Sequence, residues 1–173
     1  LAFALLFTVS AGRPYVAGIV ALMGLAASYP IIGARPQMLN ILFGALIIFI
    51  VERVRGGQLS ARWFWLFPAL FALWANMHGG YLLGLAIIGV YVIGDGAQCR
   101  FRGQSPERLE WPQVRLLALA GASGLLAALV NPNGYRLWTY AFETLGSSVF
   151  MDVISEWRSP DFHDLSYIPF LIM

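Results

Sequence analysis

Long apolar runs separated by short polar breaks dominate the pattern of this chain. The longest run extends from Trp63 to Gly94 and is interrupted near its middle by Asn76 to Gly80. As one straight helix it would be about 48 Å long, against a hydrocarbon core of roughly 30 Å. Because glycine adopts turn conformations readily, the break predicts a helical hairpin with arms at Trp63 to Ala75 and Tyr81 to Gly94. Both arms are short for a crossing, so tilt or partial re-entry stays open. A single helix kinked at Pro68 is the structural alternative.

Apolar runs on either side of the hairpin predict further membrane segments. The most polar stretch, Gln98 to Gln113, has a loop composition with Pro106 and Pro112 as breakers. Small residues at Gly121, Ser123 and Gly124 suit close helix packing. The expected segments are the tail of a span at Leu1 to Ser10, spans at Tyr15 to Ile32, Met38 to Val51 and Val114 to Val130, and another that begins at Leu165.

Two segments in the second half are more amphipathic than the spans. Tyr135 to Leu145 carries several aromatic rings beside Arg136, which favours a position flat at the membrane interface. A second short helix, from about Ser148 to Trp157, would gather its apolar residues on one face. We therefore expect an all-α fold, a polytopic transmembrane helix bundle with interfacial helices in its extracytoplasmic loops.

Composition agrees with this pattern and excludes other classes. Of the 173 residues, 59% are hydrophobic and only 12% charged, with a mean hydropathy of +0.70, far from the range of a soluble domain. The chain begins within an apolar run without Met and ends within another, so we expect a fragment with about six to seven membrane segments in one domain. The net charge of +2 and the lack of a basic tract argue against nucleic acid as a partner. The single Cys99 cannot form an intrachain disulfide.

Arginines set the expected sidedness of the bundle. If the chain crosses at each predicted span, eight of the eleven basic residues fall on one side and three on the other. The positive-inside tendency makes the richer side cytoplasmic. The richer side holds Arg13, Arg53, Arg55, Arg62, Arg100, Arg102, Arg108 and Arg115; the other holds Arg35, Arg136 and Arg158.

Four polar loops from distant parts of the chain then reach the extracytoplasmic face together. For Asn76 a turn cap is the alternative to binding, for His78 a cap and a ligand-binding or proton-transfer role are both open, and Arg136 could be an interfacial anchor. Arg35 and Arg158 sit in loops with Pro and other polar groups, which favours function. The candidate substrate-binding residues are Arg35, Gln37, Asn76, His78, Arg136, Glu156, Arg158, Asp161 and His163.

The densest group of carboxylates and imidazole is the segment EWRSPDFHD at 156 to 164. Such groups could bind a hard divalent cation or act as a base, whereas helix capping by Asp161 or Asp164 explains part of the pattern. No zinc spacing, phosphate-binding glycine loop or nucleophile elbow occurs in the sequence. A divalent cation is therefore the one cofactor left open.

Four motifs occur in order over most of the chain: ARPQ at 34 to 37, LWANMHGG at 73 to 80, LVNPNGYRLW at 129 to 138 and ISEWRSPDFHD at 154 to 164. This series resembles a group of prokaryotic polytopic proteins that look like relatives of the GT-C glycosyltransferases. That class includes the dolichyl-phosphate-mannose-protein mannosyltransferases.

The resemblance implies a fold with many membrane helices and transfer of a sugar from a polyprenyl-phosphate carrier to an acceptor on the extracytoplasmic face of a prokaryotic inner membrane. The catalytic acid of that superfamily generally lies in a first large outer loop, which would precede Leu1, so no catalytic residue is assigned here. Membrane lipid and the lipid-linked sugar are the implied partners. The alternative from a different class is a transporter, flippase or non-catalytic assembly subunit, which would carry ionisable or helix-breaking residues near the membrane midplane.

Overall fold

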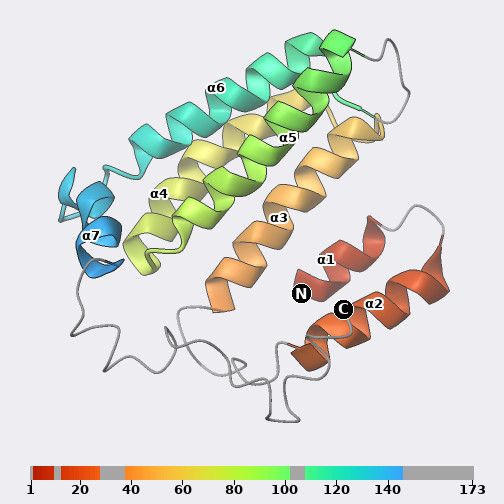
Figure 1. Ribbon diagram of the computed structural model, residues 1–173, viewed down its shortest axis with the longest axis horizontal. Coiled ribbons are helices and arrows are strands. Elements are labelled where there is room, and N and C mark those ends of the chain that lie inside the picture. Colours follow the sequence, from red (N-terminus) through yellow and green to blue (C-terminus); the bar gives the residue numbers. More distant parts are fainter. Residues whose placement is uncertain (1, 10–12, 28–37, 102–107, 146–173) are drawn as a thin grey trace.

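The described part of the chain is built from helices that follow one another with short connections (Figure 1). The computed structural model describes residues 2–9, 13–27, 38–101 and 108–145, and within these ranges it contains no strand. The all-α expectation is confirmed. The elements are α1 (Ala2–Thr8), α2 (Pro14–Ala27), α3 (Met38–Arg55), the 3₁₀-helix η2 (Ala61–Leu66), α4 (Phe67–Met77), α5 (Tyr81–Phe101), α6 (Trp111–Ala127) and α7 (Arg136–Leu145).

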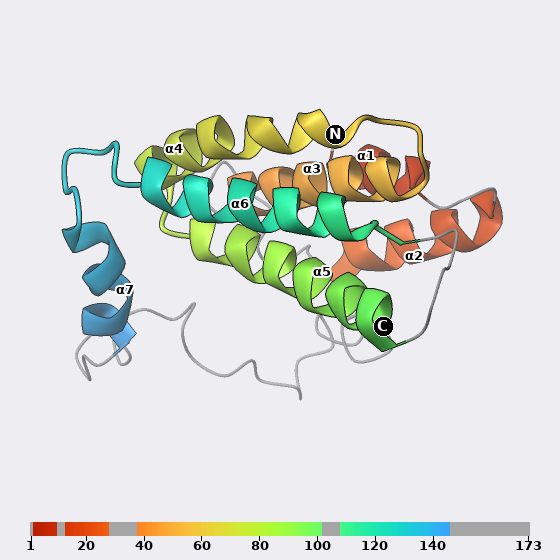
Figure 2. The same cartoon turned by 90° about the horizontal axis from the view of Figure 1, so that it is seen from above.

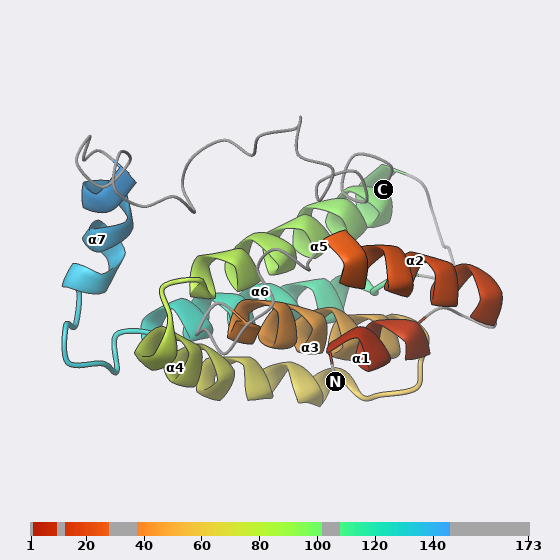
Figure 3. The ribbon, with the colours of Figure 1, turned by 90° about the horizontal axis from the view of Figure 1, so that it is seen from below.

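Helices α3 to α6 form an antiparallel bundle in which each helix reverses the direction of the one before it (Figures 1 and 2). Within it α6 packs against both α4 and α5, and α3 packs against α5. Helix α1 packs on α3 and also contacts α2, as the view from below shows (Figure 3). One end of the bundle therefore holds the end of α3, the start of η2, the end of α5 and the start of α6.

The predicted central hairpin is present. Helix α4 ends at Met77, and α5 begins at Tyr81 and runs back antiparallel to it (Figure 1). Pro68 lies in the first turn of α4, where its missing N–H costs no helical hydrogen bond, so it marks a helix start. A single helix kinked at this proline is therefore not the structure of this segment.

The extent of the helices next to the polar loop was predicted wrongly. Helix α5 continues through Phe101, so the second arm of the hairpin is 21 residues long and not short for a crossing. Helix α6 already begins at Trp111, with a capping box between Glu110 and Gln113. Pro112 lies in its first turn and starts the helix instead of breaking the chain. The predicted loop Gln98 to Gln113 is thus shortened at both ends.

Close packing at glycines brings the central helices together. A Cβ added at Gly84 would lie 2.8 Å from the Trp74 ring, and one at Gly124 would lie 2.8 Å from the Phe71 ring. A Cβ added at Gly121 would lie 3.0 Å from Ile88, so both glycines of the small-residue group predicted in Val114 to Val130 lie at close helix contacts. Aromatic and branched residues fill the remaining core, with Trp74, Tyr81, Phe64, Phe67, Phe71 and Ile47 all fully buried.

The outer surface of the bundle is strongly apolar between its two ends. Large hydrophobic side chains are exposed on several helices, among them Leu73 on α4, Val90 and Ile93 on α5, and Leu119 and Leu126 on α6. Within the described residues, α5 is one helix both long and apolar enough to cross a membrane, and α2 is a shorter apolar helix. These are the features on which a membrane assignment must rest.

Helix α7 runs across the bundle axis and not along it (Figures 1 and 2). It follows the end of α6 after a turn in which Gly134 adopts a positive φ of 53°. Asn131 Oδ1 accepts a hydrogen bond from the Asn133 N–H at 2.7 Å, the local chemistry that favours such a turn. Helix α7 occupies most of the segment Tyr135 to Leu145, whose position flat at a membrane interface stays a prediction.

Candidate functional site

A pocket of about 710 Å³ lies where α7 meets the apex of the central hairpin. Gly79 contributes from the hairpin, and the remaining lining comes from the turn before α7 and from α7 itself. Two of the predicted outer loops, 76–80 and 131–136, are therefore brought together in space. The lining residues are Gly79, Asn133, Tyr135, Arg136, Leu137, Thr139, Tyr140 and Glu143.

One face of α7 supplies the ionisable groups of this pocket. Arg136 and Glu143 are seven residues apart, close to two helical turns, so they project from the same face about 10 Å apart along the axis. Thr139 and Tyr140 lie between them on that face. Arg136 and Glu143 are both exposed. Sequence reasoning singled out Arg136 but missed Glu143, although the spacing on a predicted helix was a readable signal.

The hairpin apex holds the other two described candidates, and its polar groups bind the main chain. Asn76 donates through Nδ2 to the carbonyl oxygens of Ala72 at 2.7 Å and Val130 at 2.6 Å. His78 is the C-cap of α4, and its Nδ1 accepts a hydrogen bond from the Gly80 N–H at 3.0 Å. Asn76 therefore joins α4 to the end of α6, which is the capping role weighed against ligand binding.

A second amide locks the start of α3 to the same apex. The Trp74 Nε1–H donates to Asn40 Oδ1 at 2.8 Å, which satisfies the buried indole. The same Asn40 amide fills the space beside Gly80, where any added Cβ would collide with it. Any larger residue at position 80 would therefore have to displace the Asn40 amide that accepts the Trp74 hydrogen bond. This contact shows that the start of α3 belongs to the α7 end of the bundle.

Most of the predicted site lies outside the described residues. Helix α3 begins at the α7 end, three residues after Arg35 and one after Gln37, so the chain enters the bundle there. Within the described ranges, no three His, Cys, Asp or Glu side chains gather as a metal site would require. The candidates outside those ranges are Arg35, Gln37, Glu156, Arg158, Asp161 and His163.

The opposite end of the bundle contains a network of charged residues that was not predicted from the sequence. Asp95 on α5 is only 2% exposed and lies 3.2 Å from Arg55 Nε, at the end of α3, through its Oδ2. Asp95 also accepts hydrogen bonds from Arg55 Nη2 at 3.3 Å and from the Leu109 N–H at 3.2 Å. On the other side, Arg55 donates to Glu52 Oε1 at 2.7 Å, and the Tyr91 hydroxyl donates to the same oxygen at 2.7 Å.

This network links α3, α5 and the residue that precedes the α6 cap. Burial acts to lower the pKa of the Arg55 guanidinium, but its hydrogen bond to Glu52 and the charges of Glu52 and Asp95 raise that pKa above its ordinary value. Arg55 therefore stays cationic. The spacing of Glu52 and Arg55, and of Tyr91 and Asp95, placed each pair on one helix face, yet nothing local indicated that the two faces meet.

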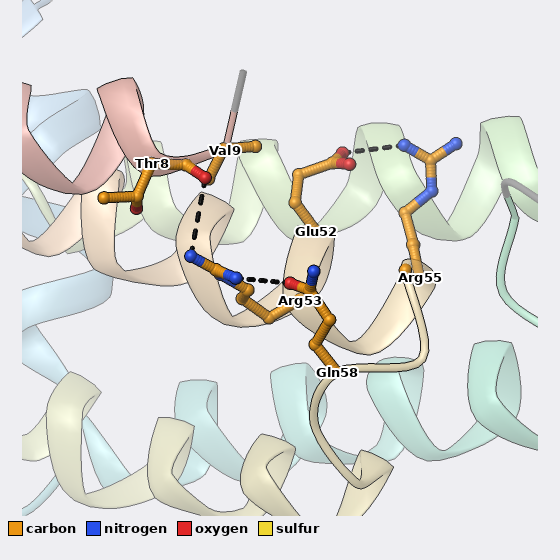
Figure 4. Close-up of a pocket in the computed structure, with 7 residues that line it drawn as sticks. Thr8, Val9, Glu52, Arg53, Arg55 and Gln58 are labelled. Carbon is orange, nitrogen blue, oxygen red and sulfur yellow. Dashed lines mark hydrogen bonds and ion pairs between the residues drawn. The ribbon is translucent and has the colours of Figure 1, made fainter. Parts of the chain in front are cut away.

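Beside the network lies a second pocket, of about 310 Å³, between the end of α1 and the end of α3 (Figure 4). The Arg53 guanidinium reaches across it and donates to the Thr8 carbonyl at 3.4 Å and to the Gln58 side-chain oxygen. Its face also lies over the Phe49 ring, 5.1 Å from the centroid. The lining residues are Thr8, Val9, Glu52, Arg53, Arg55, Gly56 and Gln58.

Six arginines of the predicted cytoplasmic set lie near this same end. They are Arg53, Arg55, Arg62, Arg100, Arg108 and Arg115, while Arg136 belongs to the α7 end. Among the described arginines this distribution agrees with the predicted segregation, whereas Arg35, Arg102 and Arg158 lie outside the described residues. A comparison with protein-family models, curated proteins and solved structures found no match to this chain. The likeness to GT-C glycosyltransferases stays a prediction.

Proposed function

We propose that this chain is part of an integral-membrane glycosyltransferase that uses a polyprenyl-phosphate-linked sugar on the extracytoplasmic side. The observation that carries the proposal is the α7 pocket, in which a guanidinium and a carboxylate face one space beside tyrosine rings. A sugar phosphate on a lipid needs a cation for its phosphate, hydrogen-bonding groups for its hydroxyls and ring surface for its sugar. The pocket offers each of these.

The membrane placement is supported by the distribution of side chains over the bundle. Leucine, isoleucine and valine side chains are exposed along α4, α5 and α6. Most described arginines instead belong to the end of α3, the start of η2, the end of α5 and the start of α6, which share one end of the bundle. In water such a surface would favour aggregation, but in a bilayer it contacts lipid tails at no cost. The arginine end then faces the cytoplasm, and the α7 pocket opens at the outer interface.

Within the pocket we assign different ligand groups to the two ionised side chains. Arg136 binds the phosphate through paired, charge-assisted hydrogen bonds, and Glu143 accepts hydrogen bonds from sugar hydroxyls. Their separation of about 10 Å suits a ligand in which sugar and phosphate are adjacent. Arg35 and Arg158 are proposed as further phosphate partners, with the acceptor unassigned.

Binding measurements can separate these roles. In nanodiscs, Arg136→Gln should weaken binding of both polyprenyl phosphate and its sugar-linked form about tenfold or more, because it removes a charge-assisted bond. Glu143→Gln should weaken only the sugar-linked form. Arg115→Gln, stacked on Trp111 at the opposite end, is the matched control and should change neither. Equal affinities of the wild type and Arg136→Gln for both lipids would overturn the proposal.

Topology offers a test that does not depend on the ligand. In a Cys99→Ser background, single cysteines at Gln58 and Gln104 should be labelled from the cytoplasm. Cysteines at Met77 and Asn133 should be labelled from outside, because the hairpin and the arginine asymmetry require it. Labelling of Met77→Cys only from the cytoplasm would contradict the membrane orientation.

A transporter is the second candidate function, favoured by the buried Asp95 on the helix that is long and apolar enough to cross a membrane. However, Asp95 is paired with Arg55 at the arginine end, away from the middle of the bundle. A transported ion or solute would have to compete with that pairing. Uptake or counterflow into proteoliposomes that is abolished by Asp95→Asn would favour the transporter over the transferase.

A further inference from the structure

The pocket between α1 and α3 combines charges of both signs that are incompletely satisfied. Among the described residues, Arg53 has only neutral hydrogen-bond acceptors, the Thr8 carbonyl and the Gln58 amide oxygen. Its Nε is buried and lacks an acceptor within the same part of the chain. Buried donors of this kind are normally satisfied by protein, water or ligand. Each Nη of the Arg53 guanidinium also carries a second N–H besides the one donated to Gln58 or Thr8, so this cation has further donors for a ligand in the pocket.

Glu52 supplies the opposite charge. Arg55 and Tyr91 both donate to its Oε1, so Oε2 has no donor among the described residues. The Glu52 side chain is 25% exposed and lines the pocket (Figure 4). One carboxylate oxygen thus remains able to accept hydrogen bonds from a ligand cation.

The local charge count decides which kind of ligand fits. The formal charges of Glu52, Arg53, Arg55 and Asp95 cancel, with Arg55 held between the two carboxylates. A simple anion would be attracted by Arg53 but repelled by Glu52. A simple cation would be attracted by Glu52 but repelled by Arg53. A zwitterion can satisfy both at once. Arg53 is also held in place by Phe49 and Gln58, so little side-chain freedom is lost on binding.

We infer that this pocket binds the headgroup of a phospholipid that carries a phosphate and a primary ammonium. The phosphate takes the donors of Arg53, and the ammonium donates to Glu52 Oε2. Phospholipid is the zwitterion that the end of a membrane bundle meets at high concentration. The inference rests on the membrane placement proposed above but is independent of glycosyl transfer.

Short-chain phospholipids provide the probe. The full chain in detergent micelles is titrated with dihexanoyl phosphatidylethanolamine, phosphatidylcholine and phosphatidylglycerol, and binding is followed by native mass spectrometry. The ethanolamine lipid should bind about tenfold more tightly than the choline lipid, whose trimethylammonium has no N–H to donate to Glu52. This comparison uses only the wild-type protein, so it holds even if a variant fails to fold.

Substitution then locates the site. Arg53→Gln should weaken binding of the ethanolamine lipid about tenfold, whereas Arg100→Gln, exposed near the same end of the bundle but outside the pocket, should leave it unchanged. Equal affinity for the ethanolamine and choline lipids would overturn the inference. Tighter binding of the glycerol lipid would also overturn it, because it would show a site for anions. None of these outcomes depends on binding at the α7 pocket, so the two proposals can fail separately.

Discussion

The two ends of the bundle are held together by different chemistry. At the arginine end, the Arg55–Asp95 pair and its neighbours connect helices through charges with little exposure. At the α7 end, neutral amides of Asn40 and Asn76 connect the helices, while the charged Arg136 and Glu143 remain exposed around a pocket. Paired and buried charges hold the fold, whereas exposed charges on a cross-running helix stay available for a ligand. Changes at the arginine end should therefore affect mainly stability, and changes at the α7 pocket should affect mainly binding of the lipid-linked sugar.

The largest loss of stability should come from breaking the buried charge pair. Asp95→Leu leaves Arg55 without its partner on α5 and the Leu109 N–H without an acceptor, which should lower the free energy of unfolding by about 3–5 kcal/mol. The double variant Arg55→Met, Asp95→Leu should recover part of that loss, because no unpaired cation remains. Reversible unfolding by SDS in mixed micelles measures the free energy of unfolding of the single and the double variant. A single variant within about 0.5 kcal/mol of the wild type would contradict the structural role of this end.

A smaller loss should follow from overpacking between the ends. Gly124→Ala forces a methyl group against the Phe71 ring and should destabilise the bundle by about 1–3 kcal/mol. Gly89→Ala on α5 is the matched control, since a Cβ there meets nothing within 4 Å and alanine favours a helix by roughly 0.5–1 kcal/mol. Opposite signs for the two changes in unfolding free energy are expected. Equal destabilisation would mean that α6 does not approach α4 as closely as described.

The smallest loss of stability is expected at the α7 end, where neutral amides connect the helices. This prediction separates stability from binding most sharply. Asn76→Ala removes hydrogen bonds to Ala72 and Val130 and should cost about 1 kcal/mol of unfolding free energy. Binding of the sugar-linked lipid should not change, because Asn76 holds the hairpin and does not line the pocket. A loss of affinity tenfold or larger, with stability unchanged, would return Asn76 to the binding site.

Local chemistry alone determined much of this protein. Neighbouring residues were enough to predict the apolar runs of helical length, the break at Asn76 to Gly80 and the turn at Asn131 to Gly134. The all-helical, antiparallel arrangement followed from these features. The gathering of most arginines at one end followed from the same alternation. Helix ends near prolines were mistaken because proline is tolerated in a first turn, as Pro68 and Pro112 show.

Only the tertiary structure decided which distant residues meet. Arg55 and Asp95 are 40 residues apart, and Asn40 and Trp74 are 34 apart. Hydrophobic periodicity shows which face of a helix is apolar, but the spans here are apolar on nearly every side. Periodicity therefore left open how each helix is rotated about its axis and which neighbours it contacts. Glycine contacts and buried polar pairs set that rotation, and with it the Arg55–Asp95 network and the pocket that joins Gly79 to Arg136 and Glu143.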